Sequence, residues 1–198
     1  MKTVNMLILI CLLVAHPLQA GVVRITFDPP TSSWPGSCVT IDEWVEKDVV
    51  FTSPNGLGHA NGGGEWGPEN GSAHLSLAVG ETLVFRFTDW TAFELLTIDL
   101  AEYSIWDDQQ EIVFVGHKTD DTTVTAEFML DGVIDGIGPL ADFETFSFGA
   151  DFKDLKFVEV PSVIYSMDNV FLVPVPDLPT FMLLGLGTLI LRNRRSSS

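Results

Sequence analysis

Hydrophobic and polar side chains alternate with a period of two through most of residues 21–173. This period places successive side chains on opposite faces of an extended strand, whereas an amphipathic helix would repeat roughly every 3.6 residues. Glycine, asparagine, aspartate and proline separate the alternating runs, as strand boundaries require. The predicted strands are Val22–Phe27, Asp48–Thr52, Leu75–Val79, Leu83–Thr88, Phe93–Leu100, Glu111–Gly116, Thr122–Phe128, Thr145–Phe148, Leu155–Val160 and Ser166–Val173.

About ten short strands in one segment favour an all-β fold, either a β-sandwich or a jelly roll. A segment of this length forms one domain and buries about 68–70% of its extended surface, which is enough for a core. We therefore expect a β-sandwich domain over residues 21–173, flanked by an N-terminal signal helix and a short C-terminal membrane helix. Most of the phenylalanines are expected to lie in its core.

Residues 1–20 have the parts of a secretory signal peptide. Lys2 supplies a positive charge, Met6–Ala15 is an apolar run, and Leu18–Ala20 ends in a small residue. The alternative is a retained membrane helix, for which the apolar run is short. We expect cleavage before residue 21 and export of the remaining chain, in which Cys38 is then the one thiol.

Residues 174–198 carry a second targeting pattern. A proline-rich linker is followed by an uncharged apolar run, Phe181–Leu191, and then by a cluster of arginines. A helix over this run and its flanking residues would span about 21 Å, against a hydrocarbon core of ~30 Å. Arginines are retained on the cytoplasmic side, so the body would lie outside the membrane that the helix enters. A plain C-terminal anchor would have the same properties.

The order of proline-rich linker, short apolar helix and arginine cluster resembles the PEP-CTERM sorting signal of bacterial exported proteins. In that family an exosortase, a membrane enzyme, is thought to recognise and cut the signal, so the resemblance implies an exosortase-type partner. The sequence has Val175 where the family usually has Glu. The residues that carry the resemblance are Val173, Pro174, Pro176, Arg192, Arg194 and Arg195.

The charge of the chain excludes one class of partner. The sequence has 10 Lys and Arg against 27 Asp and Glu, for a net charge of −17. All 27 acids and six of the bases fall within residues 21–177, which gives that stretch a charge of −21. Such a body repels phosphate backbones, so we expect no nucleic-acid binding. It attracts hard cations instead.

The order of the short motifs in the body is similar to that of galactose-binding-like jelly rolls. Those motifs are Ile25–Asp28, Leu96–Ala101, Val113–Gly116, Thr122–Thr125 and Met167–Val170. In related carbohydrate-binding jelly rolls, acids on the first and last strands often share a structural calcium. The resemblance implies Asp28 and Asp168 as metal ligands, with Asp99 as a third candidate. The alternative is that Asp168 forms ordinary strand-end or turn hydrogen bonds.

A glycine-rich segment, Pro54–Ser72, is predicted to be a long loop and the candidate ligand site. An exposed Trp66 could stack on a sugar ring while His59, Asn61 or Glu65 bonds its hydroxyl groups, and Trp34 could act in the same way. The alternative, which we favour, is that Trp66 folds back as the small core of the loop. Trp44, Trp90 and Trp106 border strand patterns and are expected to be packed.

The sequence lacks the common catalytic motifs: a nucleophile elbow, a zinc-binding helix, a phosphate loop and a Cys-x-x-Cys pair. We therefore expect a non-enzymatic exported envelope or extracellular matrix protein that contacts exopolysaccharide. Two alternatives stay open. One is a carbohydrate-active hydrolase that uses carboxylates such as Glu65 and Glu69. The other is a calcium-dependent structural envelope module without a sugar ligand.

Overall fold

The structure of the protein is a computed structural model, and it describes residues 21–77, 82–161 and 164–175. The predicted signal helix, the apolar C-terminal helix, Pro176 and the three arginines lie outside these ranges. Within the described ranges no helix is long and apolar enough to cross a membrane.

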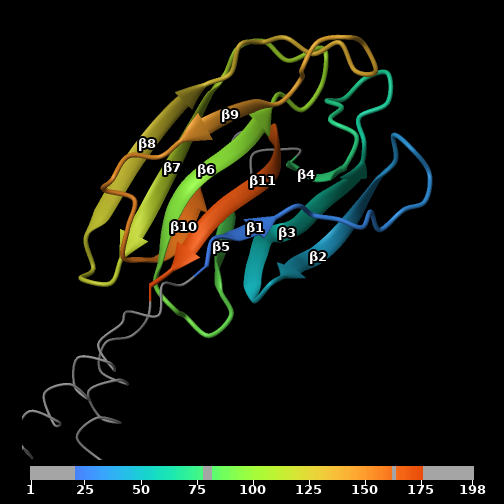
Figure 1. The fold of residues 1–198 in the computed structure, drawn as a ribbon. Helices are drawn as coiled ribbons and strands as arrows, with labels where there is room; N and C mark the ends of the chain where they lie inside the picture. Colours follow the sequence, from blue (N-terminus) through green and yellow to red (C-terminus); the bar gives the residue numbers. More distant parts are fainter. Residues whose placement is uncertain (1–20, 78–81, 162–163, 176–198) are drawn as a thin grey trace, which may run out of the picture.

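The described chain is all-β, as the sequence predicts, and its strands belong to one 11-stranded sheet (Figure 1). The strands are β1 (Val23–Ile25), β2 (Cys38–Glu46), β3 (Val49–Asn61), β4 (Ala73–Leu77), β5 (Leu83–Phe87), β6 (Phe93–Ala101), β7 (Glu111–Lys118), β8 (Thr123–Met129), β9 (Glu144–Ser147), β10 (Leu155–Val160) and β11 (Tyr165–Pro174).

Six of these strands close into an antiparallel barrel. Each strand of the barrel is hydrogen-bonded to the next one, in the order β3, β4, β11, β6, β10, β5 and back to β3. The remaining strands extend the barrel wall: β1 pairs with β11, β2 with β3, β9 with β6, and the β7–β8 hairpin with β10. The arrangement therefore differs from the predicted sandwich or jelly roll, because the strands are joined around a closed ring.

The long strand β3 makes this closure possible. Its first half, Val49–Thr52, pairs with β5, and its second half, Gly58–Asn61, pairs with β4. Between the halves lie Pro54, which has no N–H to donate, and Gly56, whose φ of 92° favours glycine. A Cβ on Gly56 would also lie 2.8 Å from the Ile41 carbonyl oxygen. The strand therefore bends here and passes from one neighbour to another.

The predicted loop over Pro54–Ser72 is wrong for its first part, because residues up to Asn61 belong to β3. Proline and glycine commonly end strands, but here they mark a bend within a strand that pairs with β2 on both sides of the bend, with a shift in register between Ile41 and Glu43. β2 was not predicted from the sequence. That strand lies at the edge of the sheet, none of its residues is fully buried, and two consecutive exposed residues, Asp42 and Glu43, interrupt its hydrophobic alternation.

The core of the barrel is rich in aromatic side chains, which confirms the expectation for most of the phenylalanines. Phe51 stacks on Phe85 at a centroid distance of 5.1 Å, and Phe85 contacts Phe93 at 6.3 Å. All three rings are 0% exposed. A second aromatic group fills the space under β8 and β9, where Phe128 lies 4.9 Å from Phe146. These contacts join the β7–β8 hairpin to the barrel.

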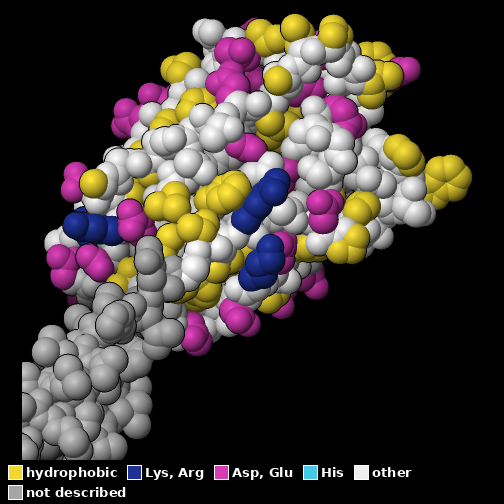
Figure 2. Space-filling view, viewed as in Figure 1, with side chains coloured by type: hydrophobic (Ala, Val, Ile, Leu, Met, Phe, Trp, Pro, Cys, Tyr) yellow, Lys and Arg dark blue, Asp and Glu magenta, His cyan; other side chains and the backbone are white. Residues whose placement is uncertain are grey.

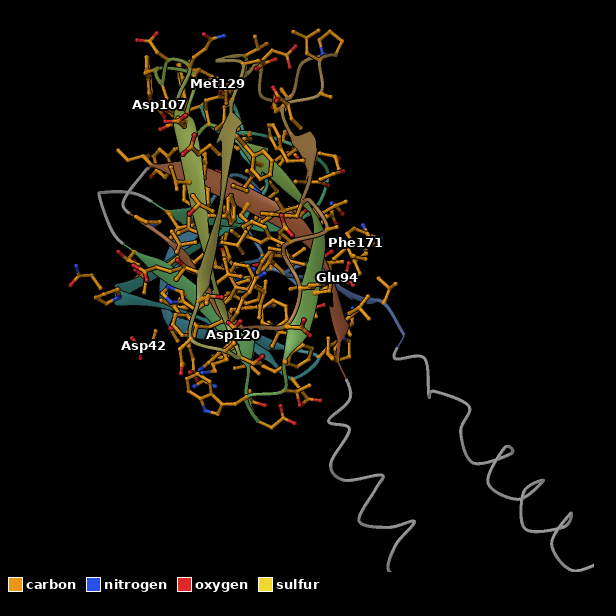
Figure 3. All side chains as sticks on the ribbon, turned by 90° about the vertical axis from the view of Figure 1, so that its left-hand side faces the viewer. Asp42, Glu94, Asp107, Asp120, Met129 and Phe171 are labelled. Atoms are coloured by element: carbon orange, nitrogen blue, oxygen red, sulfur yellow. The ribbon has the colours of Figure 1, made fainter. Side chains whose placement is uncertain are left out.

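The two ends of the barrel differ in what they carry. One end, here called the proximal end, holds both ends of the described body, because Val23 pairs with Leu172 and Val175 donates to the Ala92 carbonyl. The other, here called the loop end, is formed by segments 62–72, 102–110 and 130–143. Figure 3 places Asp107 and Met129 at the loop end and Asp120 at the opposite end.

We predict that Phe85→Ala lowers the free energy of unfolding by about 3–5 kcal/mol, because a fully buried ring leaves a cavity in the barrel. Met129→Ala is the control: the side chain is 55% exposed, and its loss should change stability by less than about 0.5 kcal/mol. Denaturant unfolding of both variants measures the difference. Equal losses would contradict the assignment of the core.

Candidate functional site

A cleft of about 220 Å³ opens at the loop end. Its floor comes from β3 and β4, one wall from the start of β2, and the other wall from the segment after β6. The lining residues are Gly36, Cys38, Ala60, Gly62, Gly63, Trp66, Gly67, Pro68, His74, Ser76, Tyr103, Ser104 and Trp106.

The floor of the cleft is built by the outer face of β4. All five residues of this strand are buried, although strands on a barrel surface usually expose alternate side chains. Leu75 packs in the barrel core, while His74 and Ser76 point to the opposite face and line the cleft. The loops at this end therefore cover a face of the barrel that would otherwise meet solvent.

Two tryptophans form the mouth of the cleft. Trp66 and Trp106 stack with ring centroids 5.2 Å apart and an interplanar angle of 12°. Their side chains remain 55% and 72% exposed, so each ring covers one face of the other and leaves its outer part open to solvent. The Trp66 carbonyl also accepts a hydrogen bond from the Ile105 N–H, which fixes the two segments to each other.

Glycines allow the loop that carries Trp66 to fold tightly. A Cβ on Gly63 would lie 2.1 Å from the carbonyl oxygens of Gly67 and Pro68. A Cβ on Gly136 would lie 2.6 Å from the Gly64 carbonyl oxygen, where the 130–143 segment crosses the loop. Larger residues at these positions would force the backbone apart, so the glycines define the shape of the cleft wall.

Buried carboxylates connect the three loop-end segments to one another and to the barrel. Glu102 accepts a hydrogen bond from the Gly132 N–H, and Asp142 accepts from the Glu69 N–H at 2.8 Å. Asp168 on β11 accepts from the Asn70 amide at 2.6 Å and the Ser72 hydroxyl at 2.9 Å. Each of these three carboxylates is 2% exposed or less. Together they hold the cleft walls in place.

Burial changes the acidity of these carboxylates. Loss of solvation raises the pKa of Asp168 to about 6, although the Asn169 N–H, Ser72 and Asn70 donate to it and lower the pKa. Burial also raises the pKa of Glu102 and Asp142. Neutral donors surround these groups, so their charge is balanced by hydrogen bonds rather than by Lys or Arg.

His74, on the cleft floor, is 1% exposed. Its Nδ1 has no hydrogen-bond partner among the described residues, and its ring lies against Phe143 at a centroid distance of 5.3 Å. Burial lowers the pKa of His74 to about 4, with a further lowering from His59. The ring is therefore neutral near pH 7, with one nitrogen as donor and the other as acceptor.

A second cavity of about 290 Å³ adjoins the first. The two share Cys38, Ser76 and Tyr103 as lining residues. The second cavity continues past Gly58 toward the bend of β3, where Thr40, Ser53 and Asn55 supply polar side chains. The two adjoining cavities are here together called the groove; it begins at the tryptophan pair and follows β3 and β4.

The structure places two of the predicted ligand residues beside the groove. Trp66 lines it, and Glu65, the residue before, is exposed on the same turn. Asn61 does not line it, because its amide donates to the Ser32 carbonyl at 2.8 Å. Trp34 is 77% exposed but lies outside the lining residues.

His59 is not available to a ligand in this structure. The side chain is 1% exposed, with Nδ1 2.6 Å from the Thr31 hydroxyl and Nε2 2.7 Å from the Phe27 carbonyl oxygen. Its ring lies 4.4 Å from that of Trp44. Because His59 belongs to β3 rather than to a loop, its side chain is fixed between β2 and the 27–31 segment.

Trp106 is the main functional candidate that the sequence analysis missed. It was expected to be packed, as was Trp90, but the two side chains are 72% and 57% exposed. Trp90 is covered on one face by the Arg86 guanidinium, 4.0 Å from the ring centroid. The polar run that follows Trp106, from Asp107 to Gln110, is the one local signal for its exposure. Trp44 is half-buried, in line with the expectation.

The predicted calcium ligands do not gather into a metal site. In the part of the chain that the structure describes, no three His, Cys, Asp or Glu side chains are arranged to hold a metal ion. Asp28 accepts a hydrogen bond from the Ala73 N–H at 3.1 Å, and Asp99 accepts from the Thr145 hydroxyl. Asp168 has hydrogen-bond donors on both oxygens. The carboxylates therefore act as hydrogen-bond acceptors within the fold.

Glu65 and Glu69, the two carboxylates considered for hydrolysis, have different surroundings. Glu69 accepts hydrogen bonds from the N–H groups of Gly63 and Gly71, so it stabilises the loop. Glu65 is exposed, and neither glutamate is among the residues that line the cleft. The side chains that line the cleft are aromatic, small or uncharged polar groups.

Comparison with known proteins gave no further indication of function: no family model matches the chain, and no curated protein matches it.

The buried imidazole of His74 predicts how stability changes with pH. Its folded pKa of about 4 lies below the ordinary value of 6.5, so the unfolded chain takes up the proton first as the pH falls. The contribution of the neutral ring to the free energy of unfolding is fully present above pH 6.5. As the pH falls to 4, this free energy decreases by on the order of 2–3 kcal/mol. Asp168, whose pKa is raised, acts in the opposite direction.

We therefore expect the free energy of unfolding of His74→Leu to decrease less between pH 7 and pH 4 than that of the parent protein, because the variant has no imidazole to protonate. Urea unfolding of both proteins across this range isolates the effect of His74 from that of the carboxylates. Parallel stability curves would show that the pKa of His74 is the same in the folded and the unfolded chain.

Proposed function

We propose that the protein is a non-enzymatic exported β-barrel protein that binds exopolysaccharide through the groove at its loop end. The stacked pair of Trp66 and Trp106 carries this proposal. Flat, exposed indole faces pack well against the apolar faces of sugar rings, and polar groups beyond them can bond hydroxyls. Large aromatic groups are also costly to leave in solvent, and two on neighbouring loops favour a binding role over a structural one.

The proposed sorting of the protein rests on the C-terminal sequence pattern. Pro174, the first proline of that pattern, is the last residue of β11, and Val175 is bonded to Ala92 at the proximal end. A chain that continues into a membrane from this point would leave the groove at the opposite end of the barrel. An exosortase-type enzyme would then act on the linker beside the proximal end, and the groove would face outward.

The binding proposal predicts that Trp66→Ala and Trp106→Ala each weaken binding to polysaccharide by roughly tenfold or more, equivalent to about 1.4 kcal/mol of lost stacking. Affinity electrophoresis of the full chain in gels that contain dextran, galactan or mannan measures the retardation. Thermal melting of each variant checks that the barrel remains folded.

Trp34→Ala and Trp90→Ala are matched controls for this experiment. Both remove an exposed indole from a position outside the groove, so retardation should stay as in the parent protein. Loss of binding in a control as large as that in Trp106→Ala would place the site elsewhere. Unfolding of Trp66→Ala would support the alternative that its ring forms the core of the loop.

For the sorting proposal, we expect that replacing Arg192, Arg194 and Arg195 with glutamine loosens membrane retention, because the cationic stop at the cytoplasmic side is lost. Fractionation of the expressing bacteria, together with mass spectrometry of both chain ends, measures location and cleavage. Unchanged fractionation and unchanged chain ends would argue against a sorting signal. Replacing Lys153 and Lys156 instead gives a control of similar charge change within the body.

A further inference from the structure

The loop end is entirely acidic in its charged residues. Segments 62–72, 102–110 and 130–143 contain no Lys or Arg. The eight acids of these segments are Glu65, Glu69, Glu102, Asp107, Asp108, Asp131, Asp135 and Asp142. All six bases of the body lie outside these segments: Arg24, Lys47, Arg86, Lys118, Lys153 and Lys156.

The position of the bases on the fold increases this contrast. Lys47, Arg86 and Lys118 lie in or beside turns at the proximal end, where the Thr88 N–H bonds to the Asp48 carbonyl. In the face shown by Figure 2, hydrophobic side chains gather along the rim formed by the loop-end segments, and the visible Lys and Arg side chains lie in the other half. An anion that approached the groove would thus meet no positive charge.

Resting on the proposed function, we propose that the groove selects an uncharged, linear polysaccharide and discriminates against acidic exopolysaccharide. The apolar and polar parts of the groove suit hydroxyl-rich neutral sugars. Exposed Glu65 and Asp108 flank the tryptophan pair in sequence and repel carboxylate or sulfate groups. Specificity of this kind arises from an unfavourable interaction with the wrong ligand as much as from contacts with the right one.

The dimensions of the groove indicate that the ligand is a chain of several sugars. The first cavity measures about 220 Å³ and the second about 290 Å³. Each lies at or below the lower limit of about 300 Å³ for small-molecule sites, whereas the joined groove falls within the usual range. The two cavities follow one another along β3 and β4, from the tryptophan pair to the bend of β3, so an extended ligand would lie along these strands.

His74 adds no positive charge to the floor of the groove. Its ring lines the first cavity and is neutral near pH 7, because burial lowers its pKa to about 4. With its side chain 1% exposed, the ring belongs to the wall of the groove and is no more available to a ligand than His59 is.

The test uses one glycan backbone with two substituents. The dextran, galactan or mannan that retards the full chain most is converted to its carboxymethyl derivative and, separately, to its hydroxyethyl derivative. The two substituents are similar in bulk, but only the first carries charge. We expect the hydroxyethyl polymer to bind like the parent glycan, and the carboxymethyl polymer to bind at least tenfold more weakly at low salt.

Added salt, and variants that remove a negative charge, distinguish electrostatic repulsion of the carboxymethyl groups from their steric exclusion. Added salt screens charges over a Debye length of about 10 Å at 0.1 M, so it should recover part of the binding to the carboxymethyl polymer. Asp108→Asn, a change at an exposed residue to which no ligand contact is assigned, should narrow the difference in binding between the two polymers without weakening binding to the hydroxyethyl polymer. Asp120→Asn, at the proximal end, is the matched control and should leave this difference unchanged.

Equal binding of the carboxymethyl and hydroxyethyl polymers at low salt would overturn the selectivity while leaving the proposed function intact. Stronger binding of the charged polymer would overturn it as well. If none of the neutral or carboxymethyl polymers retards the protein, the proposed function itself fails, and the selectivity falls with it.

Discussion

The bend of β3 at Pro54–Gly56 is the constraint on which the rest of the structure depends. A single strand can pair with both β5 and β4 only if it changes direction between them, and the two pairings are needed to close the barrel. Closure leaves fewer unpaired edges in the sheet than an open arrangement would. It also turns the outer face of β4 toward the loop end, where it becomes the floor of the groove.

The groove is held by acids rather than by hydrophobic packing. Glu102, Asp142 and Asp168 each accept hydrogen bonds from backbone or amide groups of neighbouring loops, and each is nearly inaccessible to solvent. Burying a carboxylate is unfavourable unless its oxygens are fully bonded, so these contacts specify one loop arrangement strongly. The three loop-end segments contain acids but no Lys or Arg. The residues that hold the loops therefore also contribute to the negative charge of this end.

Much of the fold could be predicted from the sequence, and the site could be predicted only in part. Alternation identified most strands because each buries one face, but it failed for β2, which lies at an edge, and for β3, whose bend contains Pro54 and Gly56. The glycine-rich surroundings of Trp66 made it a candidate ligand residue, but the favoured expectation was a ring folded back as the core of its loop, whereas the side chain is 55% exposed. Its partner Trp106 was not a candidate, because their contact joins segments 40 residues apart in the chain, and no local pattern encodes such a pairing.

The position of both ends of the barrel domain on one side has a consequence for avidity. Any tether attached there, at residue 21 or at residue 175, holds the groove on the far side, so many tethered copies can present their grooves in parallel. Under the proposed function, a long polymer would then engage several copies at once, and weak single contacts would combine into durable attachment through effective concentration. Shallow, open sites are well suited to such attachment, because each contact can release and re-form while the polymer stays in place.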